Sequence, residues 1–247
     1  MTKRFENNVV VITGGSGGIG LATAKLFALE GAHVYITGRR QELIEAAVKE
    51  IGHGAVGVQG DVSNAADVAR LYERIQHDHH KVDVVFANAG MYAASPLDTI
   101  DDAQFEATFN VNVKGVLFTV QKALPLMSAG SSVVLNGSVA GSMGLPDQSL
   151  YNASKAAVRS FARSWTNDLK ARGIRVNVVS PGGTETRMIR SYLDAQPEVE
   201  EAMNQSVPLG RLGDPNEVAR AVLFLASSDS SFVAGHELFV DGGVNAV

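Results

Sequence analysis

Residues 9–30 read VVVITGGSGGIGLATAKLFALE, and this stretch decides the fold. It joins a short apolar run, Val9–Thr13, through a glycine-rich turn to a segment of helical periodicity, Ile19–Glu30. A strand that is apolar throughout and leads directly into a helix is typical of a parallel sheet covered on both faces. Glycines in such a turn allow close backbone approach to a pyrophosphate, whose charge the start of the helix can meet. The stretch therefore predicts a dinucleotide-binding unit.

The spacing of the glycines leaves an alternative open. Gly14, Gly18 and Gly20 are separated by three residues and then by one, so the ordinary G-x-G-x-x-G fingerprint is absent. A turn with a purely structural role is the competing interpretation.

The alternation of strand and helix continues to the end of the chain. The other predicted strands are His33–Thr37, Ala55–Gln59, Val82–Ala87, Val133–Asn136, Ile174–Val179 and Leu238–Val240, and the other predicted helices are Gln41–Ile51, Ala65–His77, Asp101–Met127, Ser149–Ala171 and Pro215–Ala226. We expect an α/β fold: one Rossmann-type domain over residues 1–247, with a doubly wound, seven-stranded parallel sheet and helices on both faces. Cofactor and substrate would then meet at the carboxyl ends of the strands.

Composition excludes several classes of protein. Of the 247 residues, 45% are hydrophobic and 19% charged, which fits a globular chain and excludes a disordered one. The net charge of −5, with Lys and Arg scattered, argues against nucleic acid as a partner. The chain has no cysteine, no apolar run of membrane-spanning length and no signal-peptide pattern at its start, so we expect a soluble, cytoplasmic protein without a membrane partner.

Four further motifs follow the predicted strands. They are Asn88-Ala89-Gly90, Ser138, Tyr151-x-x-x-Lys155 and Pro181-Gly182. Together with T-G-x-x-x-G-I-G at residues 13–20, they resemble the short-chain dehydrogenase/reductase family almost end to end. The resemblance implies a nicotinamide-dependent oxidoreductase.

Tyr151 and Lys155 are four residues apart on a predicted helix and so share one face. A free tyrosine has a pKa of about 10, and a nearby ammonium is expected to lower that pKa toward the working range. The resemblance implies that Tyr151 exchanges the proton with the substrate, that Lys155 also binds the nicotinamide ribose, and that Ser138 orients the carbonyl oxygen. It places the fourth catalytic residue at Asn112, holding a water that links Lys155 to solvent, with Asn110 as the alternative register.

The resemblance also assigns residues to the nucleotide. They are Gly14, Ser16, Gly17, Gly18, Ile19, Gly20, Gly38, Arg39, Arg40, Asp61, Val62, Asn88, Ala89, Gly90, Tyr151, Lys155, Pro181, Gly182, Thr184 and Thr186. Asp61 would bond the adenine amino group; its alternative role, a helix N-cap, suits Ser63 or Asn64 better.

The choice of nucleotide depends on the end of the second strand. NAD-selective relatives carry a carboxylate there for the ribose hydroxyls, whereas this chain has Gly38 followed by Arg39 and Arg40. Arginines offer charge-assisted hydrogen bonds to a 2′-phosphate, so we expect NADP(H) to be favoured over NAD(H), with Arg39 as the main contact. A solvated arginine pair remains the alternative.

No metal site is expected. His77–His80 lies at the polar end of a helix and lacks the spacing of a zinc site, so it is interpreted as solvated surface. Asp98, Asp101 and Asp102 are interpreted as loop and helix-start charges.

The segments expected around the substrate are largely apolar. They are Met91–Tyr92, Val139–Leu145 and Met188–Leu209, the last forming a connection that would serve as a lid at about 187–210. The named lining residues are Met91, Tyr92, Met143, Leu145, Met188, Ile189, Tyr192 and Leu193. They favour a small hydrophobic ketone or secondary alcohol, as in the broad-range carbonyl reductases and secondary alcohol dehydrogenases of the family. A 3-oxoacyl-carrier-protein reductase, with Arg187 and Arg190 as modest basic docking residues, is the enzymatic alternative, and a non-catalytic nucleotide-binding regulator is the alternative of another class.

A homotetramer is also expected. The predicted helix at Ser149 carries apolar residues around most of its circumference, Phe161 and Trp165 among them, and Asp101–Met127 has the same excess. The resemblance implies that these helices pair across one two-fold axis and that Leu238–Gly243 forms a second contact.

Overall fold

The structure is a computed structural model that describes residues 3–194 and 197–246. Its strands form one sheet in the order β3-β2-β1-β4-β5-β6-β7, and all neighbours run parallel. They are β1 Val9–Thr13, β2 His33–Gly38, β3 Val56–Gln59, β4 Val84–Ala87, β5 Ser132–Asn136, β6 Arg175–Pro181 and β7 Glu237–Val240. The predicted doubly wound, seven-stranded parallel sheet is confirmed.

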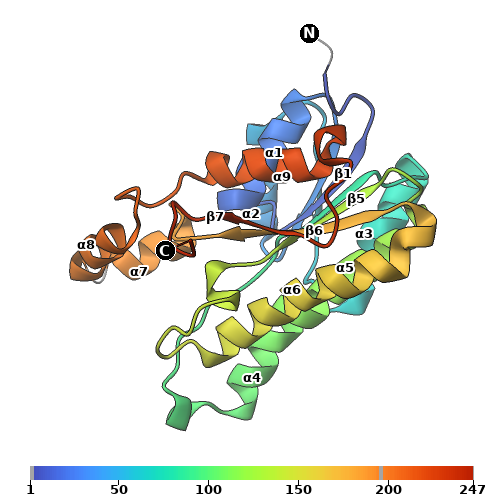
Figure 1. Cartoon of the computed structure of the whole chain (residues 1–247). Coiled ribbons are helices and arrows are strands. Elements are labelled where there is room, and N and C mark those ends of the chain that lie inside the picture. The colour runs from blue at the N-terminus through green and yellow to red at the C-terminus, as the bar shows by residue number, and fades with distance from the viewer. Residues whose placement is uncertain (1–2, 195–196, 247) are drawn as a thin grey trace.

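Helices cover both faces of the sheet (Figure 1). One face carries α1 Gly18–Leu29, α2 Gln41–Ile51 and α9 Pro215–Ala226, and the other carries α3 Ala65–Asp78, α5 Gly115–Ala123 and α6 Ser149–Leu169. In β1, Val9 and Val11 join the core beneath α3, α5 and α6, while Val10 and Ile12 join the core beneath α1, α2 and α9. Because strand side chains alternate between faces, a strand this apolar is stable only between two layers of helices.

The prediction of one continuous helix over Asp101–Met127 is wrong. The structure has α4 Asp102–Phe109, a π-helical turn at Asn110–Lys114, then α5 and a 3₁₀ turn at Leu124–Leu126. The widened turn places Asn112 at its centre, fully buried, with its side chain bonded outside the helix. Hydrophobic periodicity does not reveal such a turn because the apolar residues on either side remain in helices.

The predicted connection at 187–210 is largely helical. It contains α7 Arg187–Leu193 and α8 Pro197–Ser206, which project beside the C-terminal end of the chain (Figure 1). Leu193, expected to face the substrate, is only 1% exposed and anchors α7 instead. The side chain of Tyr192 lies outside the described residues.

Candidate active site

The carboxyl ends of β1, β4 and β5 are joined by buried polar contacts. Asn88, just after β4, donates from Nδ2 to the carbonyl oxygens of Thr13 (2.9 Å) and Gly14 (3.2 Å), and its Oδ1 accepts from Asn136 Nδ2 at 3.0 Å. The Thr13 hydroxyl oxygen accepts from the backbone amides of Asn88 and Ala89 at 3.0 Å each. The Asn88 side chain therefore holds three strand ends together, a structural role that the motif alone did not reveal.

The glycine-rich turn leaves the start of α1 open. Gly14 and Gly18 have φ of +65° and +52°, a conformation that favours glycine. A Cβ on Gly20 would lie 2.3 Å from the Gly14 carbonyl oxygen, whereas a Cβ on Gly17 would meet nothing within 4 Å. Gly17 is the N-cap and supplies no capping side chain, and the first turn of α1 holds no acidic residue. The backbone amides at the start of α1 are therefore left without a capping side chain, which fits the binding of a pyrophosphate.

A small cavity adjoins this turn where β1, β2 and β3 end. Its lining residues are Thr13, Thr37, Gly60, Asp61, Val62, Asp67, Val68 and Leu71. Asp61 accepts hydrogen bonds from the Ser63 amide (2.9 Å) and hydroxyl (2.7 Å), and Asn64 caps α3, which agrees with the expected division of roles. Asp61 and Val62, the residues expected to contact the adenine, thus lie just beyond the end of β3.

The residues expected to bind the 2′-phosphate of the nucleotide lie at the carboxyl end of β2 and directly after it. A Cβ on Gly38 would lie 3.2 Å from Ser16 Oγ, so the end of β2 faces the glycine-rich turn. Arg39 and Arg40 are exposed, and among the described residues neither pairs with a carboxylate.

Tyr151 and Ser138 come together from α6 and the end of β5. Burial raises the pKa of the Tyr151 hydroxyl above its usual value, and a hydrogen bond with the Ser138 hydroxyl opposes that rise. The ring of Tyr92 packs edge-on against that of Tyr151, with centroids 5.2 Å apart. Ser138 also accepts from the Ala140 amide at 3.2 Å, capping the turn that follows β5.

Lys155 is buried one turn along α6. Its Nζ donates to the Asn136 carbonyl oxygen at 2.8 Å and lies 5.7 Å from the centroid of the Tyr151 ring. Burial lowers the pKa of Lys155 to about 8. The expectation that Lys155 lowers the pKa of Tyr151 is wrong for this structure, because desolvation of the phenol outweighs every other influence on it.

Asn112 reaches the same cluster from the π-helical turn. Its Oδ1 accepts from the Met91 amide (2.8 Å), and its Nδ2 donates to the Met91 carbonyl (2.9 Å) and to Ser154 Oγ (3.1 Å). A Cβ on Gly90 would lie 3.4 Å from Asn112 Oδ1 and 3.6 Å from Lys155 Nζ. Asn112 Oδ1 and Lys155 Nζ therefore both lie close to Gly90.

The end of β6 leads back over the glycine-rich turn. Pro181 is the last residue of β6, and Gly182 packs against Asp241 so closely that a Cβ would lie 2.9 Å from its Cα. Thr184 is buried and donates to the Gly182 carbonyl at 3.0 Å. Thr186 caps α7, and its side chain lies over Gly18.

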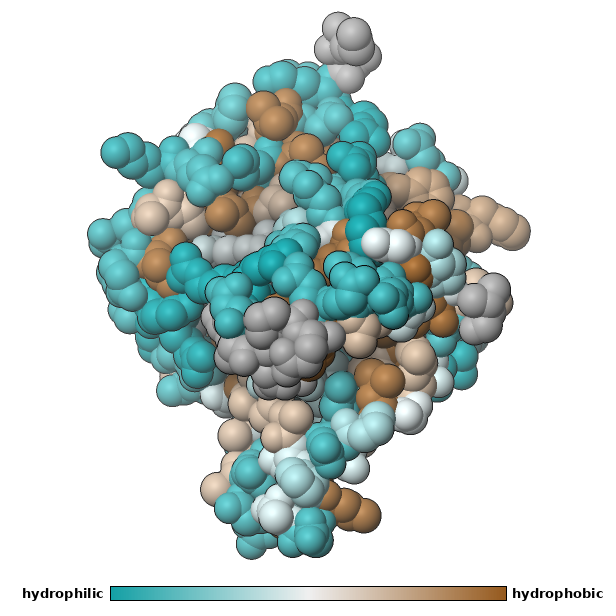
Figure 2. All heavy atoms as spheres, turned by 90° about the vertical axis from the view of Figure 1, so that its left-hand side faces the viewer, coloured by the Kyte–Doolittle hydropathy of each residue, from teal (hydrophilic) through white to brown (hydrophobic). Residues whose placement is uncertain are grey.

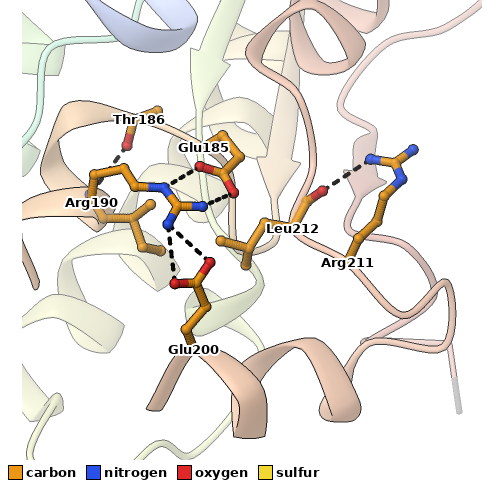
Figure 3. Close-up of polar contacts among 7 residues, drawn as sticks. Glu185, Thr186, Arg190, Glu200, Arg211 and Leu212 are labelled. Carbon is orange, nitrogen blue, oxygen red and sulfur yellow. Dashed lines mark hydrogen bonds and ion pairs between the residues drawn. The ribbon is translucent and has the colours of Figure 1, made fainter. Parts of the chain in front are cut away.

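Two features of the site were not predicted from the sequence. Asn136 is the partner of Lys155 and Asn88, and its Oδ1 is buried without a hydrogen-bond partner. Its position at the end of a predicted strand was the available signal. Arg190 on α7 bridges Glu185 and Glu200, an arrangement that depends on how α7 and α8 pack (Figure 3).

The histidine run lies away from these strand ends. His77 pairs with Asp78, whose carboxylate also accepts from the Tyr35 hydroxyl at 2.7 Å, and His79 stacks on His33 with centroids 4.5 Å apart. Among the described residues, no group of three or more acidic or histidine side chains could hold a metal ion. In the same part of the chain, no helix has both the length and the apolar character needed to cross a membrane.

Known proteins resemble the chain over nearly its whole length. A family model described as enoyl-(acyl carrier protein) reductase matches residues 14–245. The oxidoreductase asL5 of Sarocladium schorii is 46% identical over 244 residues, covering 98% of this chain and 97% of that protein. The 3-oxoacyl-[acyl-carrier-protein] reductase FabG of Thermotoga maritima is 38% identical, with 98% and 99% covered. The NADP-dependent (R)-specific alcohol dehydrogenase of Lentilactobacillus kefiri is 36% identical, with 100% of both chains covered.

The fold has equally close counterparts among solved structures. The crystal structure of a short-chain dehydrogenase/reductase, glucose/ribitol dehydrogenase, from Brucella melitensis superimposes with a TM-score of 0.93 at 33% identity, covering 99% of each chain.

Proposed function

This chain belongs to the short-chain dehydrogenase/reductase family of oxidoreductases, which act on alcohols and carbonyl compounds with NAD(H) or NADP(H), and on that basis we propose a specific activity. The protein transfers a hydride between NADP(H) and a small hydrophobic ketone or secondary alcohol, with Tyr151 as the acid/base. The convergence of Ser138, Tyr151 and Lys155 in one buried cluster carries this proposal.

Each residue of the cluster has a distinct task. The bound nicotinamide supplies or accepts the hydride. Ser138 donates to the carbonyl oxygen, and Tyr151 delivers the proton to it, since the raised pKa of Tyr151 keeps the phenol protonated at neutral pH. Lys155 keeps its charge below pH of about 8 and stabilises the phenolate that remains after proton transfer.

Asn112 and Gly90, which lie beside Lys155, support these tasks. Asn112 holds the backbone at Met91, and Gly90 leaves space beside Lys155 Nζ. In our proposal, a water held in this space by Asn112 returns protons to Lys155.

The preference for NADP(H) rests on charge. Gly38 contributes no carboxylate to repel a 2′-phosphate, and the exposed Arg39 and Arg40 can pair with it. The Lentilactobacillus relative, whose name records NADP dependence, supports the same preference.

The preference for a small apolar substrate rests on the segments around the cluster. Met91, Tyr92, Met143 and Leu145 are half-buried there, and Ile189 on α7 is half-buried as well. The face that carries α7 and α8 is mixed, with hydrophilic residues gathered across its middle (Figure 2). Helix α8 adds the carboxylates Glu200 and Glu201 to this face, which disfavours docking of an acidic carrier protein.

The rival activity, reduction of a carrier-bound 3-oxoacyl group, is favoured by the Thermotoga relative. Its docking would depend on the basic residues Arg187 and Arg190. Arg190 is already paired with two carboxylates, Glu185 and Glu200, so its charge is neutralised locally. We therefore keep the free ketone or alcohol as the main proposal.

We also propose a homotetramer. Phe161 and Trp165 on α6 stack with centroids 4.5 Å apart and remain half-buried, and Phe105 on α4 is 47% exposed. Phe232, just before β7, is fully exposed. Apolar surface at two separate places fits two isologous contacts. Light scattering coupled to size exclusion should give about four times the 26.1 kDa of one chain, and a mass of one chain at micromolar concentration would refute the assembly.

A panel of aromatic and aliphatic ketones, assayed with NADPH and with NADH, tests the activity. We expect NADPH oxidation with hydrophobic ketones and a clear preference over NADH. An acyl thioester on a carrier protein, included in the panel, should be a poorer substrate. Nucleotide binding without turnover on any member would favour the non-catalytic regulator instead.

A further inference from the structure

A single guanidinium joins the two helices that project beside the active site. Arg190 donates to Glu185 from Nε at 2.5 Å and from a second nitrogen, and its Nη1 lies 2.9 Å from Glu200 Oε1 and 3.1 Å from Oε2 (Figure 3). Glu185 precedes α7 and Glu200 lies on α8. One side chain thus connects the end of the β6 loop, α7 and α8.

Thr186 is next to this bridge, because it follows Glu185 in the chain and its backbone bonds to that of Arg190. The Thr186 carbonyl accepts from the Arg190 amide at 2.9 Å, and a Cβ on Gly18 would lie 3.0 Å from Thr186 Cγ2. The position of α7 therefore decides how closely Thr186 approaches the glycine-rich turn. Glu185 is also held from the other side, where its amide donates to the Gly213 carbonyl at 2.9 Å.

The helices need such a connection because α7 has only 7 residues. A helix that short is not stable alone, and two carboxylates without the arginine would repel each other. A planar guanidinium can serve both carboxylates at once, which an ammonium cannot do with the same geometry. The hydrogen bonds to Glu185 and then Glu200 raise the pKa of Arg190, so the charge persists at all working pH values.

We propose that Arg190 is a positioning residue: by bridging Glu185 and Glu200 it holds α7 and α8 as one unit and keeps Thr186 over the glycine-rich turn. Nucleotide affinity then depends on an ion-pair bridge whose three residues are not among those expected to bind the nucleotide. The inference rests on the proposed function in one respect, namely that the turn binds a nicotinamide nucleotide.

Arg190→Met tests the proposal through a separation of binding from rate. We expect the Kd for NADPH, followed by nucleotide fluorescence, to rise about tenfold, with kcat at saturating NADPH changed less than about threefold. Arg190→Lys should give an intermediate Kd, because the ammonium retains the charge but not the double pairing. Arg4→Met is the matched control, since Arg4 also makes two bonds to a carboxylate, Glu30, far from this site; its Kd should equal that of the wild type.

A double-mutant cycle isolates the bridge itself. Glu200→Gln should weaken NADPH binding in the wild-type background and have no effect in the Arg190→Met background. Added salt should weaken binding more in the wild type than in Arg190→Met, because ion pairs this exposed are screened.

The two possible failures are distinguishable. A wild-type protein that binds neither NADPH nor NADH overturns the proposed function. A wild type that binds NADPH, with Arg190→Met and Glu200→Gln each binding equally well, overturns the role of Arg190. An additive double mutant would likewise contradict the bridge, since it would show that the two residues act independently.

Discussion

The cluster around Tyr151 and the α7–α8 segment are held in place by opposite means. Asn112 is fully buried and Lys155 is 5% exposed, and both bond to backbone groups at 2.8–2.9 Å. In α7 and α8, the side chains of Arg190 and Glu200 are 40% and 32% exposed and bond to each other. The groups proposed for chemistry are thus fixed by buried hydrogen bonds, and the segment proposed to position Thr186 is fixed by ion pairs that water and salt can weaken.

Because of this difference, substitutions in the two regions should affect stability and function differently. Loss of a partner in the buried cluster leaves a polar group without water, which costs stability as well as function. Loss of a partner in α7 or α8 exposes a charge to solvent, which costs little stability. Substitutions in the two regions should therefore give different combinations of effects on rate, affinity and stability.

The largest expected effect isolates chemistry from binding. Tyr151→Phe should lower kcat about 10³-fold, because it removes the proton donor while keeping the ring against Tyr92. The Kd for NADPH should change less than about twofold. Steady-state kinetics and fluorescence titration check both values, and a variant that retains a tenth of the rate would show that the proton comes from another group.

A smaller effect is expected at the end of β2, where the nucleotide is chosen. Gly38→Asp combined with Arg39→Ser should shift the ratio of kcat/KM for NADPH to that for NADH about 100-fold toward NADH, through repulsion of the 2′-phosphate and loss of a charge-assisted bond. Ser16 Oγ, 3.2 Å from the new Cβ, can rotate away. Arg40→Ser alone is the comparison that measures the second arginine. An unchanged ratio in the double variant would remove Arg39 from the site.

A third prediction compares how much a substitution in each region changes the free energy of unfolding. Asn112→Ala should lower the free energy of unfolding by about 2–3 kcal/mol, because it leaves the Met91 backbone and Ser154 without their buried partner. Arg190→Met should leave the unfolding midpoint within error of the wild type. Urea denaturation followed by circular dichroism measures both. Equal losses would show that α7 and α8 belong to the same cooperative core as the catalytic cluster.

The smallest expected change in stability at pH 7 is a gain, obtained at the cost of activity. The pKa of Lys155 is lowered from 10.5 to about 8, so the unfolded chain binds more protons between these values and wild-type stability should rise with pH across that window. The full rise from this group is about 3 kcal/mol. Lys155→Met should lack the rise and, at pH 7, be more stable by about 1 kcal/mol, since the lost bond to Asn136 offsets part of the gain.

Denaturant titrations of wild type and Lys155→Met from pH 7 to 10 check this prediction. The variant should also lose turnover and bind NADPH more weakly, because the ammonium serves both the phenolate and the ribose in the proposed mechanism. A difference in stability that stays constant with pH would contradict the lowered pKa.

The order of elements could be predicted because its signals are local. Val9–Thr13 is apolar throughout, and helix and strand periodicities alternate after it, so the parallel, doubly wound sheet follows from patterns within a few residues of each position. The signal for the glycine-rich turn is equally local, since glycine is the residue type that readily adopts the positive φ found at Gly14 and Gly18. Tyr151 and Lys155 share a face because any helix places residues four apart together.

Contacts between distant segments were decided only by the tertiary structure. The π-helical turn at Asn112, the bond from Lys155 to Asn136 and the bridge from Arg190 to Glu200 each join segments whose relative placement no local pattern encodes. The pKa of Tyr151 belongs with them: the cation that the sequence places nearby predicts a lowered pKa, whereas burial of the phenol raises it. Burial is a sum over every element packed around the phenol, and therefore exists only once the chain has folded.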